Sequence, residues 1–192
     1  GNISSGYDVS IRQGYNKVTF QGENAKLEGQ INLVNGGQNE IHFKKGGTIT
    51  GLIQTKIDGY GPNFDQKNVW NRITFDGNEN ASISGKGNVI SSSGRANIIT
   101  FNGTGTNTIT GNIFAENSNS AFKGNGNNTI TFNSNGTNTI NGNIVINSGS
   151  NTIIFKTLEP SQMQKDASLE PSQSPNSSKI DGSIQAFGGV NT

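Results

Sequence analysis

A five-residue motif, N-x-[I/V]-x-F, occurs six times along the 192-residue chain and constrains the fold more than any other feature. Side chains alternate between the two faces of a strand, so each copy predicts a strand with Asn, Ile or Val, and Phe on one face. We expect these residues to stack on their counterparts in the other copies. The stacking residues are Asn16, Asn39, Asn71, Asn97, Asn128 and Asn151, with Phe20, Phe43, Phe75, Phe101, Phe132 and Phe155.

A second motif, [I/L]-x-G-x-I, follows most copies of the first about nine residues after the Phe. Its Gly is expected where the chain bends, or where the backbone needs a positive φ. The copy at Ile83 and Gly85 is imperfect, because Gly87 stands where Ile is expected and Val89 follows two residues later. The two motifs alternate along the chain, which indicates a regular repeat.

The shortest period is 23 residues, from Phe20 to Phe43 and again from Phe132 to Phe155. This length suits one coil of a parallel β-helix, so we predict an all-β solenoid of about six coils. Inward Asn residues fit such a stack, because each amide can donate to and accept from the amide one coil away. The alternative is a set of antiparallel hairpins with turns at Asn102-Gly103 and Asn135-Gly136.

The chain is predicted to be a single β-helical segment over residues 1–192. Three stretches break the period and are expected to be inserted loops: 52–70, 116–126 and 156–178. The coils at the two ends of a stack have unpaired backbone groups. We therefore expect flanking coils in a longer protein, or end-to-end self-association.

Composition excludes several classes of function. The 14 Lys and Arg nearly balance the 13 Asp and Glu, and no basic block favours nucleic acid. Apolar runs are short, which argues against membrane insertion by this segment. The chain has no Cys and one His, His42, so we predict no metal, no cofactor and no catalytic residue.

The segments NTITFNSNGTNTINGNIVI, residues 128–146, and ANIITFNGTGTNTITGNIFA, residues 96–115, resemble the passenger repeats of vacuolating-cytotoxin-like autotransporters. The resemblance implies a right-handed parallel β-helix that a C-terminal translocator exports to the bacterial surface or the medium. It also implies a non-enzymatic stalk whose loops face host cells, where a surface protein or a glycan is the expected partner. No catalytic residue is implied, and neither is pore formation, because the chain lacks the apolar N-terminal segment of the toxin.

The first insertion is the best candidate for a binding loop. Flat, amphipathic aromatic side chains on a displayed loop can form a platform for a sugar ring or a protein partner. The residues expected to contribute are Tyr60, Phe64 and Trp70, with Asp58 and Asp65.

A carbohydrate-active β-helical enzyme is the main alternative. It requires two carboxylates within about 5–10 Å of each other across a scissile bond. The candidates are Asp58, Asp65, Asp76 and His42, with Lys56, Lys67 or Arg72 nearby. His42 shares the parity of Glu40, so it is expected on the outer face.

An ice-binding solenoid is a lesser alternative. Outward Thr pairs are expected at Thr48 and Thr50, Thr108 and Thr110, and Thr129 and Thr131. The equivalent outward positions elsewhere are predicted to hold Lys17, Glu40, His42 and Arg72, which would interrupt a flat hydroxyl array. Calcium binding is not expected, because the G-G-x-G-x-D pattern of calcium-loaded β-rolls is missing.

Overall fold

The computed structural model describes residues 2–5, 14–34, 37–56, 69–92, 96–116, 126–156 and 177–192. Within these residues every regular element is a strand, and no helix is long and apolar enough to cross a membrane. The nine-stranded sheet contains β1 (Asn2–Ser5), β3 (Lys26–Val34), β5 (Gly47–Lys56), β7 (Ala81–Ser92), β9 (Asn107–Ala115), β11 (Asn138–Asn141), β12 (Ile144–Ile146), β14 (Ser178–Asp181) and β15 (Ile184–Ala186). The seven-stranded sheet contains β2 (Gly14–Phe20), β4 (Gly37–Phe43), β6 (Trp70–Phe75), β8 (Ala96–Gly103), β10 (Gly126–Ser134), β13 (Gly149–Lys156) and β16 (Val190–Asn191).

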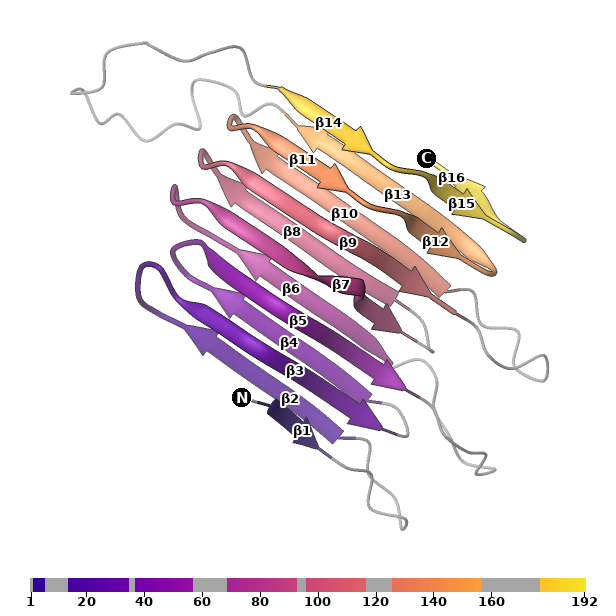
Figure 1. The fold of residues 1–192 in the computed structure, drawn as a ribbon, viewed down its shortest axis with the longest axis horizontal. Coiled ribbons are helices and arrows are strands. Elements are labelled where there is room, and N and C mark those ends of the chain that lie inside the picture. Colours follow the sequence, from indigo (N-terminus) through magenta and orange to yellow (C-terminus); the bar gives the residue numbers. More distant parts are fainter. Residues whose placement is uncertain are drawn as a thin grey trace.

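The chain winds through the two sheets in turn as a parallel β-helix, which confirms the predicted fold class (Figure 1). The chain alternates between the sheets, and the coils stack in chain order from the N-terminal to the C-terminal strands (Figure 1). Each strand pairs with its counterpart in the next coil in parallel. The hairpin alternative is therefore wrong. The expected number of about six coils stays a prediction.

The Phe stack forms as predicted. Successive rings from Phe20 to Phe155 lie 4.4–5.0 Å apart between centroids, and all five pairs are stacked. The ring planes turn by 14° and 17° over the first two steps, but only by 2–4° from Phe75 onward. The Phe rings from Phe75 onward are therefore nearly parallel to one another.

The Asn ladder also forms, and it points in one direction. Each amide Nδ2 donates to the Oδ1 of the Asn in the next coil at 2.8–2.9 Å, from Asn16 through to Asn151. Asn191 extends the ladder by one more bond, at 2.9 Å, which the sequence motif did not reveal.

Each interior Asn also ties the two sheets together. The Nδ2 of Asn97 donates to the backbone oxygen of Phe114 in the opposite sheet at 2.8 Å, and Asn39, Asn71, Asn128 and Asn151 make equivalent bonds. Buried amides are stable only when hydrogen-bonded. The ladder therefore fixes the register both along the rod and across it.

The glycines of the second motif adopt a positive φ, as one form of the prediction had it. Five of them have φ between 109° and 158°: Gly29, Gly51, Gly111, Gly142 and Gly182. Gly142 and Gly182 lie at bends between strands, whereas Gly29, Gly51 and Gly111 lie within β3, β5 and β9. The imperfect copy is accommodated by a β-bulge in β7. Ile90 pairs with Ile53 and Ile113 and takes the expected Ile position, while Val89 is also fully buried.

The strands extend further than the sequence indicated. Residues 52–56, expected in the first loop, continue β5, and Trp70 is the first residue of β6. Gly126, Lys156 and Ser178 likewise belong to strands. The alternation of apolar inward residues ends before β5 ends. The next inward position after Ile53 holds Thr55, which is buried and donates its hydroxyl to the Ser92 hydroxyl at 3.1 Å.

Candidate functional site

The outer side of β2, β4 and β6 carries most of the outward-facing aromatic and charged side chains that the structure describes on the seven-stranded sheet. The strand register places them in rows that run along the rod axis. One row is Tyr15, Gln38 and Trp70; the next is Lys17, Glu40 and Arg72. We call these six residues the aromatic-charged face. Further along the same rows the residues are smaller or uncharged, beginning with Ala96 and Ile98.

Glu40 is the centre of the N-terminal part of this face. The Tyr15 hydroxyl donates to its Oε2 at 2.5 Å, and the Lys17 Nζ lies 3.2 Å from its Oε1. The hydrogen bond from Tyr15 is the main cause that lowers the Glu40 pKa, against the opposing effect of burial. The same bond raises the pKa of Tyr15, and Glu40 raises that of Lys17. Glu40 is therefore held as a carboxylate that orients its neighbours.

Trp70 and Arg72 form the other end of the face. The Arg72 guanidinium carbon lies 4.6 Å from the centroid of the Trp70 ring, within the range of a cation–π contact. The two residues are two positions apart on β6, so both project outward. This contact orders the indole ring of Trp70 and the guanidinium of Arg72 relative to each other.

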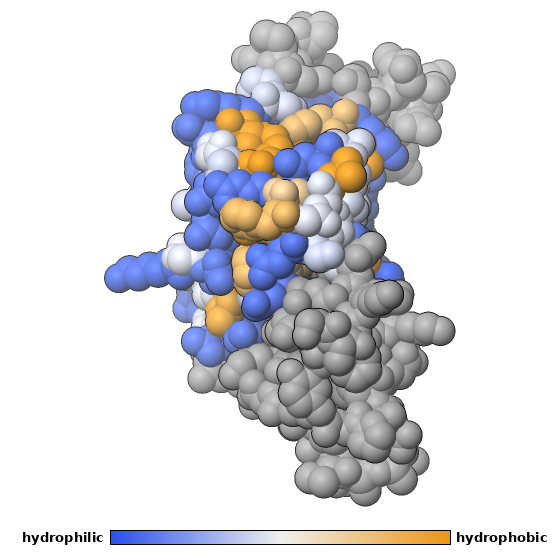
Figure 2. Space-filling model, turned by 90° about the vertical axis from the view of Figure 1, so that its right-hand side faces the viewer, coloured by the Kyte–Doolittle hydropathy of each residue, from blue (hydrophilic) through white to orange (hydrophobic). Residues whose placement is uncertain are grey.

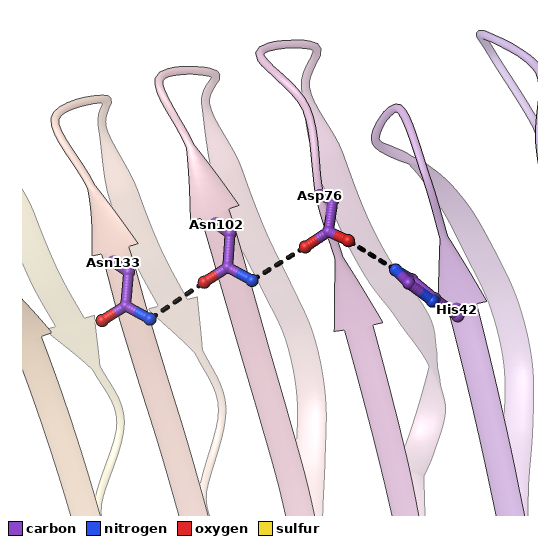
Figure 3. A network of polar contacts seen from close by, with 4 residues as sticks. All are labelled: His42, Asp76, Asn102 and Asn133. Atoms are coloured by element: carbon purple, nitrogen blue, oxygen red, sulfur yellow. Dashed lines mark hydrogen bonds and ion pairs between the residues drawn. The ribbon is translucent and has the colours of Figure 1, made fainter. Parts of the chain in front are cut away.

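His42 joins a second polar ladder, on the surface (Figure 3). Its Nε2 lies 2.5 Å from the Asp76 Oδ2, while Asp76 Oδ1 accepts a bond from Asn102 at 2.8 Å. Asn102 in turn accepts from Asn133 at 2.9 Å. Burial alone would raise the Asp76 pKa, but the bonds from Asn102 and His42 outweigh it and lower the pKa. These four side chains thus form three successive hydrogen bonds along the rod axis.

The Asp76 carboxylate is expected to contribute in full to stability above its unfolded-state pKa of about 3.9. Its folded-state pKa is lowered, so the contribution is lost as the pH falls through that lower value. We therefore expect wild type to lose more unfolding free energy than Asp76→Asn between about pH 5 and pH 2. Asp76 is partly exposed, so the difference should stay below about 1 kcal/mol. Urea unfolding at several pH values measures it, and parallel curves for the two proteins would contradict it.

The two carboxylates on or beside the face are poorly placed for glycoside hydrolysis. Glu40 pairs with Arg72, four residues before Asp76, which corresponds to about 13 Å along the strand. An inverting enzyme needs about 6.5–9.5 Å and a retaining one about 5–5.5 Å. A general acid also needs a raised pKa, whereas both carboxyl pKa values are lowered.

The structure places only part of the predicted site. Trp70 lies on β6, whereas Asp58, Tyr60, Phe64 and Asp65 are outside the described residues, and so is Lys67. Tyr15 was missed. Aligning the six motif copies reveals it, since the residue before each Asn falls in the row that contains Tyr15 and Trp70. Among the described residues no group of three or more His, Cys, Asp or Glu could hold a metal ion.

The outward Thr pairs require a correction. Thr48, Thr50, Thr108 and Thr110 lie on the nine-stranded sheet, while Lys17, Glu40, His42 and Arg72 lie on the other. These charged residues therefore do not interrupt the first two pairs. Thr129 and Thr131, however, lie on β10 in the rows that contain Arg72 and His42, so the expected interruption holds for the third pair. On the nine-stranded sheet the register aligns two rows: Thr48, Ser82, Thr108 and Thr139; and Thr50, Ser84, Thr110 and Asn141. We call these eight residues the hydroxyl grid.

No protein-family model matches the chain, and neither does any curated protein or solved structure. The function is therefore inferred from the geometry. On the side that faces right in Figure 1, hydrophilic and hydrophobic residues are mixed along the rod (Figure 2).

Proposed function

We propose that the chain is a non-enzymatic β-helical stalk segment of a surface-exposed or secreted, autotransporter-like bacterial protein. The observation that carries this proposal is the unbroken in-register stack of Phe and Asn through the rod. Such a core suits a rigid spacer, because each coil is held only by its neighbours and coils can be added without changing the design. The repeat resemblance supports the same assignment.

The rod serves display. Interior strands have both backbone edges paired, so they offer proteases and other chains no open edge. Residues between the strands can then vary without disturbing the core. In this proposal the inserted loops and the aromatic-charged face contact a protein or glycan on a host cell.

Two measurements on the purified chain test the stalk. Native digestion with a broad-specificity protease, followed by mass mapping, should give no cuts within β4, β6, β8 or β10. Early cuts inside these strands would contradict a rigid spacer. Incubation with bacterial and host polysaccharides should release neither reducing nor unsaturated ends. Release of either would show an enzyme and overturn the proposal.

The hydroxyl grid favours a second candidate function, binding to ice. Neighbouring residues within a row are about 4.8 Å apart, and the two rows are nearly 7 Å apart along the strands. The grid itself contains no charged residue, but its two rows continue into Lys26 and Glu28 on β3 and into Lys179 and Asp181 on β14. The Ile residues beneath the grid are fully buried. A flat and rigid hydroxyl lattice is what a crystalline surface of water requires.

Thermal hysteresis of the freezing point tests this candidate. Wild type should show a gap between melting and freezing, and Thr110→Lys in the grid should remove most of it. The matched control is Thr152→Lys, which adds the same side chain to the opposite sheet. No gap in wild type, or equal loss in both variants, would reject ice binding.

A further inference from the structure

Tyr15 and Trp70 form a pair of aromatic groups along the rod axis. The register pairs Tyr15 with Gln38 and Gln38 with Trp70, so the aromatic residues are two strands apart. Two strand spacings correspond to about 9.6 Å. The disaccharide repeat of an extended β-linked glycan is of similar length, so two alternate sugars can each meet one ring, with the Gln38 amide between them.

The neighbouring row supplies charge. The row of Lys17, Glu40 and Arg72 contains two positive charges and one negative charge. Lys17 and Glu40 form an ion pair, so the row has one net positive charge, which Arg72 supplies. A guanidinium presents donors in a planar fork that matches a carboxylate, and it can stay stacked on an aromatic ring while it binds. Arg72 already stacks on Trp70.

We propose that the aromatic-charged face binds an acidic glycan that lies along the rod axis. Sugar rings pack on Tyr15 and Trp70, and a sugar carboxylate pairs with Arg72. This inference rests on the proposed display function and names the class of its ligand. Further along the row the residues are Ala96, Asn127 and Ser150, which are small enough to let a longer chain continue over β8, β10 and β13.

The face is preorganised for this task. Tyr15 is half-exposed, yet its hydroxyl is fixed by Glu40, and Trp70 is braced by Arg72. All three strands belong to one continuous ladder with the buried Asn and Phe stacks behind them. Groups that are already ordered lose little conformational entropy on binding.

The only Trp of the chain is Trp70, so intrinsic fluorescence reports directly on the site. The probe is a hyaluronan hexasaccharide, which has a carboxylate on every second sugar, and the control ligand is the same oligosaccharide with its carboxyls reduced to alcohols. We expect a saturable change in fluorescence with the acidic form, and a dissociation constant at least tenfold higher with the reduced form. Equal affinity for the two forms would overturn the role of Arg72 and the acidic assignment.

Variants separate the contacts. Arg72→Gln and Tyr15→Ala should each raise the dissociation constant at least tenfold, whereas Tyr15→Phe keeps the ring and should bind within a fewfold of wild type. Thr108→Ala, on β9 of the opposite sheet, is the matched control and should not change it. Thermal melts identify any variant that has lost its fold.

The proposal would be overturned by the lack of any fluorescence or calorimetric signal with millimolar hexasaccharide. That result would leave the stalk assignment standing, because protease mapping and polysaccharide release test the stalk independently. Conversely, polysaccharide cleavage would end the stalk assignment even if the hexasaccharide bound.

Discussion

Asn97→Ala is expected to lower the free energy of unfolding by about 3–5 kcal/mol. Asn97 is fully buried, and its side chain makes three hydrogen bonds. Removing this side chain leaves one Asn71 N–H, the Asn128 Oδ1 and the Phe114 carbonyl oxygen without the hydrogen bond that Asn97 provided. Each unsatisfied buried group costs about 1–3 kcal/mol, and the apolar surroundings offer no replacement. Denaturant unfolding followed by far-ultraviolet circular dichroism measures the loss.

The matched control for Asn97 is Asn102, five residues later. Asn102 also bridges coils through its amide, since it donates to Asp76 and accepts from Asn133. It lies on the outer side, where water can take over the bonds, so Asn102→Ala should cost about 1 kcal/mol or less. Equal losses in the two variants would mean that the buried ladder adds nothing beyond ordinary surface bonds.

The repeat motif predicts the core so well because every copy faces the same environment. Asn, Ile or Val, and Phe have the same parity in each motif strand, so one correct assignment of parity orients all six copies of the motif. Parity separates inside from outside, but it does not say which sheet an outward residue joins. For this reason the sequence placed Thr48 and Lys17 in one array, although they lie on different sheets.

The site was less predictable than the core. Trp70 was identified from its residue type, but its partner Tyr15 is 55 positions away and meets it only through the strand register. The β7 bulge was hidden for a related reason. A strict period assigns Gly87 to the Ile position, whereas the chain inserts extra residues so that Ile90 reaches it. Burial of the larger apolar side chain decides the register, because one exposed Ile would cost more than one looped-out Gly.

Gly51→Ala is expected to have an effect at least as large, about 4 kcal/mol or more, or to prevent folding. Gly51 has a φ of 140°, which disfavours any side chain. A Cβ at this position would also lie 1.7 Å from the backbone oxygen of Gly29 in the preceding coil. Backbone oxygen cannot move aside without breaking the pairing of β3 with β5. Unfolding by denaturant measures the loss where the variant is soluble.

Two further glycines separate the causes of this effect. Gly87 also has a positive φ, 70°, but a Cβ there would meet nothing within 4 Å. Gly87→Ala therefore tests backbone strain alone and should cost about 1–2 kcal/mol. Gly22 has open space around it, and Gly22→Ala should change stability by less than about 0.5 kcal/mol. If Gly51→Ala destabilised the protein no more than Gly87→Ala, the close approach of neighbouring coils would not restrict which residue can occupy position 51. Side chains larger than that of Gly should then be tolerated at Gly111 and Gly142 as well.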